Sequence, residues 1–331
     1  MKDLVRLGLL GVAHFHADSY ARVAKKLSNV EIAGVYDRSP GLASQFAENF
    51  GLRRYGGPEE LLKDVDAVVI ASENVLHHEY VLKAAEMGKH ILCEKPMAVS
   101  LKQADEIVKT VEKTGIKFQM CYVMRYHTVS VLVKELLADG RIGKLLAMNG
   151  TNKLNRTLPL LRPWFTDREL SGGGAVMDHT VHLSDLMRWY AGSEIVEVYT
   201  VIGRNVNPEI GVEDNFLTTV RMENGVIGSI DGSWTYASGH YTWGDVTMEL
   251  VGSDGVLVMD AFRQNIYYTG SDKLSWHYYG CDPDMLMVED FIRCIREDTR
   301  PKAGVYDGRQ GVAVTIAGYE SSRLGRPVKP G

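Results

Sequence analysis

The stretch that decides the fold reads Val68-Val69-Ile70-Ala71-Ser72-Glu73-Asn74-Val75-Leu76-His77 and, further on, Gly88-Lys89-His90-Ile91-Leu92-Cys93-Glu94-Lys95-Pro96. It starts in a β-branched apolar run over 67–71, which is typical of a strand covered on both faces. A helical pattern over 77–87 ends at Gly88, and 91–93 is a second apolar run. A strand, a helix and a strand in this order predict a βαβ unit with parallel strands and a right-handed crossover.

The same alternation extends outward over the first third of the chain. Apolar runs indicate strands at 5–11, 30–36 and 117–120, and helical patterns fill 18–26, 40–50 and 100–114. Ser39-Pro40 and Ser100 have the character of helix N-caps. We therefore predict an α/β domain over residues 1–122, with the doubly wound parallel sheet of a Rossmann fold.

The pattern changes after Cys121. Helical stretches cover 129–139, the segment from Gly172-Gly173-Gly174 to Tyr190, 285–296 and 307–321, while 149–162 is polar and reads as irregular. From Glu194 to about Tyr268 strand follows strand, with tight hairpin turns at Asn224-Gly225 and Asp254-Gly255. Residues 123–331 are predicted to form an α+β domain with an open, mostly antiparallel sheet. Its helices are too few to cover both faces, so we expect a homodimer or homotetramer.

Composition excludes several classes of protein. The net charge of −5 over 331 residues shows no basic surface for nucleic acid or anionic membranes. The four cysteines form no C-x-x-C pair, which argues against a zinc ribbon and fits a reducing compartment, so we expect a cytoplasmic protein. The apolar run 7–13 reads as a buried strand rather than a signal peptide, and no stretch approaches the ~20 residues that span a bilayer.

The turn after the first strand suggests a dinucleotide site. Gly11-Val12-Ala13-His14-Phe15-His16 occupies the position of G-x-G-x-x-G, with Ala and His replacing the second and third glycines. Gly11 can make the tight turn, Ala13 still allows a phosphate to approach, and His14 and Phe15 lie in the same loop. Taken alone, this loop also fits an ordinary β–α turn without a nucleotide.

The end of the second strand supports the nucleotide interpretation. Asp37 follows Gly11 at the distance expected of an acid that binds the ribose hydroxyls and repels a 2′-phosphate. Arg38 is next, and its guanidinium could instead pair with a 2′-phosphate. The sequence therefore predicts NAD and leaves NADP possible.

The quoted stretches resemble the Gfo/Idh/MocA oxidoreductases, whose hallmarks are T-P-N-x-x-H and E-K-P. Here Ser72-Glu73-Asn74 stands for T-P-N, and a second hallmark appears as Gly172-Gly173-Gly174 followed by Asp178 and His182. The resemblance covers nearly the whole chain. It implies an NAD(P)-dependent dehydrogenase acting on the CH–OH group of a sugar, inositol or related polyol, and a cis Lys95–Pro96 bond. The cofactor-binding residues that it implies are Ser72, Asn74, His77, Glu94 and Lys95.

One helix face carries the candidate chemistry. Asp178, His182, Asp185 and Trp189 are spaced i, i+4, i+7 and i+11, so they share a polar stripe that fits a wet cleft. We predict that His182 is the general base, that Lys95 stabilises the alkoxide, and that Asp178 binds a hydroxyl and holds His182. His179 points elsewhere and is expected to be structural. Weaker candidates for the cleft wall are Tyr122, Arg125, Asn155 and Trp164.

Three alternatives accompany this interpretation. A metal at Asp178 and His182 is not expected, because no second cluster completes its ligands and Lys95 supplies positive charge. An NAD-dependent lyase or glycoside hydrolase that uses transient oxidation would need the same residues. A non-catalytic regulator that binds dinucleotide and sugar is disfavoured, since Lys95 and His182 are both present.

Overall fold

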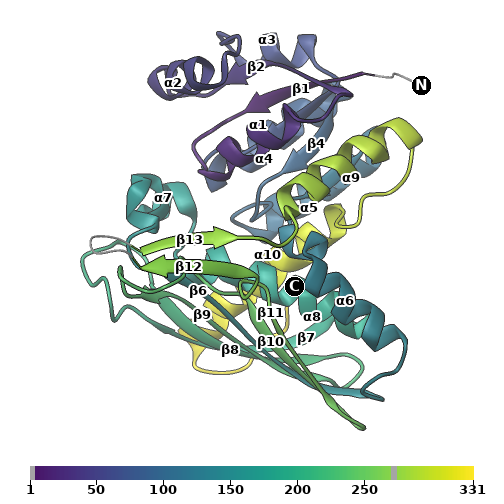
Figure 1. The fold of residues 1–331 in the computed structure, drawn as a ribbon, viewed down its shortest axis with the longest axis vertical. Coiled ribbons are helices and arrows are strands. Elements are labelled where there is room, and N and C mark those ends of the chain that lie inside the picture. The colour runs from purple at the N-terminus through teal and green to yellow at the C-terminus, as the bar shows by residue number, and fades with distance from the viewer. Residues whose placement is uncertain (1–3, 270–273) are drawn as a thin grey trace. The chain divides into compact units, whose positions relative to one another are not determined.

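The computed structural model describes residues 4–269 and 274–331, which form two compact units (Figure 1). Unit 1 comprises residues 1–123 and 283–312, and unit 2 comprises 124–282 and 313–331. The sequence pattern instead predicts that everything after residue 122 belongs to the second domain. Segment 283–312 belongs to unit 1 because its helix packs against the first helix of the chain. Amphipathic periodicity shows that such a helix has a buried face, but not which sheet it covers.

Unit 1 is built on a five-stranded parallel sheet in the order β2-β1-β3-β4-β5, as the sequence predicts. The strands are β1 (Val5–Leu10), β2 (Val30–Tyr36), β3 (Ala67–Ile70), β4 (His90–Cys93) and β5 (Phe118–Met120). The helices are α1 (His16–Ala24), α2 (Pro40–Phe50), α3 (Pro58–Asp64), α4 (Asn74–Glu86), α5 (Leu101–Thr114) and α9 (Pro283–Glu297). The strand order changes direction between β1 and β3, and a crevice for a ligand forms at the carboxyl ends of strands at such a point.

The edge strand β5 is covered by the late segment of unit 1. The Met120 amide donates to the Ala303 carbonyl at 2.9 Å, and the Gln119 side chain donates to the Met287 carbonyl at 3.0 Å. The first of these bonds occupies a backbone group that an open sheet edge would otherwise expose.

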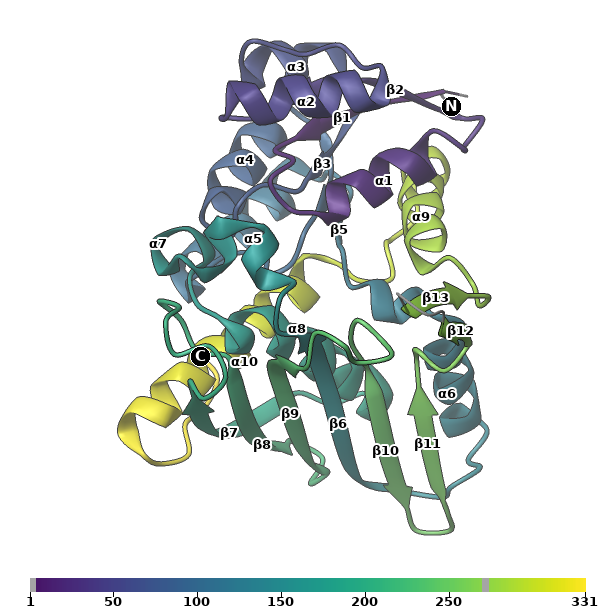
Figure 2. The same ribbon diagram turned by 60° about the vertical axis from the view of Figure 1, so that its left-hand side comes forward.

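Unit 2 contains a six-stranded sheet in the order β11-β10-β6-β9-β8-β7, which Figure 2 shows side by side. The strands are β6 (Leu145–Asn155), β7 (Ile195–Gly203), β8 (Asn215–Met222), β9 (Ile227–Tyr236), β10 (Thr247–Gly252) and β11 (Val256–Asp260), with a separate pair β12 (Asn265–Thr269) and β13 (Leu274–Tyr278). The helices are α6 (Thr128–Ala138), α7 (Arg168–Ser171) and α8 (Ala175–Ala191), and α10 (Val305–Leu324) begins in unit 1. All described strand pairings of this unit except that of β6 with β9 are antiparallel, and both predicted hairpins are present.

The prediction that residues 149–162 are irregular is wrong over the first half of that segment. Residues 145–155 form β6, which lies inside the sheet between β9 and β10. Its inward positions include Met148, Gly150 and Asn152, and two of these three are small or polar. The alternation of apolar and polar residues that reveals a strand is therefore hidden. Gly150 provides room for Leu183 of α8, which packs on this face.

The other face of the unit 2 sheet exposes apolar side chains: Tyr199, Val201, Leu217, Val256 and Val258. The helix α8 contacts the opposite face through β6, β8 and β9. Among the described residues, no helix combines the length and apolar character needed to cross a membrane.

Candidate active site

The loop between β1 and α1 is held between the ends of β2 and β3. The amide of Gly11 donates to the Tyr36 carbonyl at 2.7 Å, and the amide of His14 donates to the Ala71 carbonyl at 2.9 Å. Gly11 has φ +83°, and a Cβ there would overlap Ser72. Glycine is therefore required at this turn. The fold thus brings the predicted residues Gly11 and Ser72 into contact, with Ala13 and Phe15 in the same loop.

Asp37 fastens this loop from the end of β2. One carboxylate oxygen accepts from the Val12 amide at 2.8 Å and the other from the Ser39 amide at 2.8 Å. The side chain is buried. A carboxylate oxygen can accept more than one hydrogen bond, so this arrangement still leaves capacity for a ribose hydroxyl. Arg38, the other residue predicted at the ribose, forms an ion pair of 3.0 Å with Glu73.

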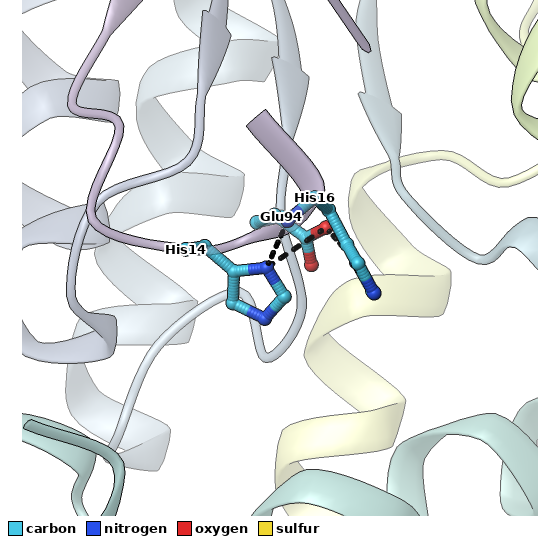
Figure 3. Close-up of side chains that lie close together, drawn as sticks. All are labelled: His14, His16 and Glu94. Carbon is cyan, nitrogen blue, oxygen red and sulfur yellow. Dashed lines mark hydrogen bonds and ion pairs between the residues drawn. The ribbon is translucent and has the colours of Figure 1, made fainter. Parts of the chain in front are cut away.

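Glu94 is the centre of a cluster with His14 and His16, shown in Figure 3, in which Glu94 and His14 are buried and His16 is half-buried. Its Oε1 lies 2.7 Å from His16 Nδ1 and 3.8 Å from His14 Nδ1, and it also accepts from the Tyr20 hydroxyl. Its Oε2 accepts from the Lys95 amide at 2.8 Å. Burial raises the pKa of the Glu94 carboxyl, but the charges of His14 and His16 outweigh burial and hold this pKa well below its usual value.

Two imidazoles and a carboxylate are a ligand set that zinc accepts. Here, however, both oxygens of Glu94 already accept hydrogen bonds from three different groups. We therefore assign the cluster to holding the first loop on the turn after β4. His16, which replaces the third glycine of the nucleotide motif, reaches Glu94 from the start of α1.

His77 joins the two loops that follow β3 and β4. Its Nδ1 lies 2.7 Å from the Pro96 carbonyl and its Nε2 lies 3.2 Å from the Ser72 carbonyl. The ring is completely buried, and burial lowers the pKa of His77. The Lys95–Pro96 bond beside it is cis, as the family resemblance implies. The contacts of His77 position Lys95, and a direct contact with the cofactor is still a prediction, as it is for Asn74 at the start of α4.

The carboxylate of Asp178 on α8 is fixed by two ring N–H groups. Its Oδ2 lies 3.1 Å from Trp234 Nε1 and 2.9 Å from His179 Nε2. His179 Nδ1 lies 2.5 Å from the Asn152 carbonyl. A carboxylate and a carbonyl both accept hydrogen bonds, so these two contacts fix the orientation of the His179 ring beside Asp178. The sequence predicts a structural role for His179 but does not indicate this contact with Asp178.

The start of α8 is attached to the segment before β8. Glu213 Oε1 accepts from the Gly174 amide at 2.8 Å, the Val176 amide at 3.2 Å and the Tyr319 hydroxyl at 2.6 Å. A Cβ on Gly174 would collide with the Glu213 carbonyl oxygen. Gly174 thus admits the close approach of the protein's own backbone. Glu213 was missed because nothing in its local sequence marks it.

The four weaker substrate candidates all have supporting contacts. Arg125 binds Asp185 through two bonds of 2.7 and 2.6 Å, and the Asn155 amide donates to the Ala237 carbonyl at 3.1 Å. The ring of Trp164 lies 4.2 Å from that of Phe165. In unit 1, Tyr122 is buried. The contact of these side chains with substrate is still a prediction. His182, on the same helix as Asp178, is half-buried.

Comparisons with known proteins agree with this geometry. Residues 5–122 match the oxidoreductase family with an NAD-binding Rossmann fold, and residues 131–258 match the GFO/IDH/MocA C-terminal domain. The scyllo-inositol 2-dehydrogenase (NAD(+)) of Bacillus subtilis is 27% identical over 99% of this chain and 97% of its own length. An uncharacterized oxidoreductase of the same organism is 32% identical over 80% of this chain and 78% of its own.

A solved structure shows the same fold. GenD2 from gentamicin A biosynthesis, crystallised in complex with NAD, superimposes with a TM-score of 0.89 at 22% identity, covering 99% of this chain and 97% of that one. The nucleotide loop, the Glu94-Lys95-Pro96 turn and the Asp178–His182 helix are thus carried by the expected architecture. The chain belongs to the Gfo/Idh/MocA family of NAD-dependent oxidoreductases.

Proposed function

We propose that this enzyme oxidises a hydroxyl-bearing carbon of a cyclic polyol or sugar of the inositol class, with NAD as hydride acceptor. The observation that carries the proposal is the arrangement on α8. Asp178 has a carboxylate fixed by His179 and Trp234, and His182 lies one turn further along the helix. An oriented acceptor beside a half-buried imidazole suits a substrate rich in hydroxyl groups. The scyllo-inositol dehydrogenase relative supports the same substrate class.

The reaction separates a hydroxyl group into a carbonyl, a proton and a hydride. NAD supplies the hydride acceptor when bound. In our assignment, His182 accepts the proton of the reacting hydroxyl at a ring nitrogen, and the Lys95 ammonium donates a hydrogen bond to the oxygen as negative charge develops. Asp178 accepts a hydrogen bond from a hydroxyl of the substrate and thereby orients the ring.

The decisive experiment is a panel of inositols and sugars incubated with enzyme and NAD, with NADH measured by absorbance. A dehydrogenase forms NADH in proportion to a ketone product. A lyase or glycoside hydrolase would show transient NADH and a cleaved product, and binding without turnover would indicate a regulator. Either of the last two results would overturn the proposal.

The cofactor preference should favour NAD over NADP, because the Asp37 carboxylate repels a 2′-phosphate. Calorimetric titration of each cofactor measures this directly. Asp37→Ala should narrow or reverse the preference. Tighter binding of NADP to the unmodified protein would contradict it.

We also propose that the enzyme is a homodimer or homotetramer joined through the exposed face of the unit 2 sheet. Tyr199, Val201 and Leu217 are 38%, 55% and 51% exposed there, and a second copy of the sheet would bury them. Light scattering that showed a monomer at micromolar concentration would contradict this. All four cysteines are free thiols, which supports our proposal that the protein works in the reducing cytoplasm.

A further inference from the structure

Glu73 is the point where this chain departs most clearly from the T-P-N hallmark, because an acid replaces the proline. The structure places its carboxylate beside Arg38, with Oε1 at 3.0 Å from one guanidinium nitrogen and 3.2 Å from another. Glu73 itself is only 9% exposed. Its second oxygen, Oε2, is buried and has no hydrogen-bond partner among residues 4–269 and 274–331.

Local stability does not explain this acid. Glu73 is the N-cap residue of α4, but its side chain accepts no hydrogen bond from the helix amides. The side chain of Arg38 is 42% exposed, and ion pairs with a partner exposed to that degree contribute little to stability. A buried oxygen without a donor is unfavourable in the protein alone. The group is better explained by a ligand that supplies the donor.

The position of Glu73 indicates which part of the cofactor is concerned. Asp37 and Arg38 follow β2, Glu73 follows β3, and the Gly11 loop lies between these strand ends. In sheets of this type the acid after β2 binds the adenosine ribose, and a nearby arginine accommodates the 2′-phosphate of NADP. Arg38 has the correct place for that second task, but Glu73 engages its guanidinium.

We propose that Glu73 is a selectivity residue that makes this enzyme prefer NAD. Its carboxylate neutralises Arg38, so that Asp37, Arg38 and Glu73 together present a net charge of −1 to the ribose. Its Oε2 accepts a hydrogen bond from the adenosine half of the cofactor. This inference rests on NAD being the cofactor and is independent of the substrate.

The test is calorimetric titration of the full-length protein with NAD and with NADP, without substrate. Glu73→Gln removes the charge and keeps the size, and Glu73→Pro restores the residue of the hallmark. Proline fits here, because Glu73 has φ −63°. Both variants should bind NADP about tenfold more tightly than the parent and NAD a few-fold more weakly, since a freed guanidinium attracts the 2′-phosphate.

The gain in affinity for NADP must depend on Arg38. In the double variant Glu73→Gln/Arg38→Ala the tighter binding of NADP should disappear. Glu79→Gln is a matched control, because Glu79 lies on the same helix and pairs with Lys83 at 3.3 Å on the surface, so both affinities should be unchanged. The inference is overturned if Glu73→Gln and Glu73→Pro bind NADP within twofold of the parent, or if the gain survives without Arg38. A protein that binds NAD as described but oxidises no polyol would refute the proposed function alone.

Discussion

Glu94 in unit 1 and Asp178 in unit 2 are both carboxylates in contact with histidine, but their partners come from different places. Glu94 is fully enclosed, receives hydrogen bonds from His16 and Tyr20 of α1 and from the Lys95 amide, and lies 3.8 Å from His14 of the first loop. Asp178 is 9% exposed and is held by the next residue of its own helix and by Trp234 of β9. An acid enclosed by several segments serves to hold those segments together. An acid fixed on one oxygen, on the helix face that carries His182, is oriented for chemistry.

The largest effect that distinguishes the two regions should come from His182. His182→Ala should lower kcat by about 10²–10⁴-fold while the Kd for NAD stays close to that of the parent, because only the proton acceptor is lost. The rate of oxidation should rise with pH through one ionisation, and the variant should lack this rise. Stopped-flow kinetics and titration measure both.

His16→Gln, at the Glu94 cluster, is the variant to compare with His182→Ala. It should raise the Kd for NAD with little change in kcat, because it loosens the first loop rather than the chemistry. If His182→Ala left kcat unchanged, the proton acceptor would have to be sought at Lys95, whose amine becomes a base when burial lowers its pKa.

A smaller effect is expected from His179. His179→Gln should raise KM for the polyol about tenfold, because the Asp178 carboxylate loses the ring nitrogen that orients it. His78→Gln is a control, since His78 forms a pair of 2.8 Å with Glu106 within unit 1. Steady-state kinetics of the parent and of both variants measure this change. An unchanged KM in His179→Gln would refute the role of this contact in orienting Asp178.

Gly174→Ala tests how α8 is attached. The added methyl group would meet the Glu213 carbonyl, so the unfolding free energy should fall by about 1–3 kcal/mol. Gly192→Ala, at the other end of the helix, is the comparison, because it meets no neighbour but has φ +57°. Its loss should come from backbone strain alone, at about 1 kcal/mol. Denaturant titration measures both, and equal losses would argue against the collision.

The smallest effect concerns the pH dependence of stability through His77. Burial lowers the pKa of His77 in the folded protein below the unfolded value of about 6.5, so the unfolded chain binds a proton first as the pH falls. The contribution of the neutral ring is complete above that pH and is lost below it. Between pH 7 and 5.5 the parent should lose stability more steeply than His77→Gln, by on the order of 1 kcal/mol. Identical slopes would show that folding does not lower the pKa of His77.

The sequence predicts elements with a strong local signature, and it places them correctly where the signal and the packing agree. The strand Ala67–Ile70, which is buried along its whole length, the helix after Ser100 and the two hairpin turns all have such signals. The strand β6 was missed because its inward side carries Gly150 and Asn152. The assignment of α9 failed for another reason, since its partner α1 lies far away in the chain.

The residues of the candidate site divide in the same way, into those with a local sequence signature and those without one. Lys95, Asp178 and His182 were found because they belong to motifs and to one helical stripe. The roles of Glu213, the contact of His179 with Asn152 and the pairing of Glu73 with Arg38 depend on contacts between distant segments, which no periodicity records. One signal was present for Glu73, namely an acid in the place of the proline of the hallmark.

The late segment that covers β5 affects the state of the nascent chain during translation. The strands of unit 1 are complete at residue 120, but Ala303, which pairs with Met120, is translated much later. At about 5–20 residues per second, the ribosome needs roughly 10–40 s to synthesise the intervening chain. During that interval the nascent sheet has an uncovered edge and lacks α9, and it is therefore at this stage that we expect the chain to depend most on chaperones.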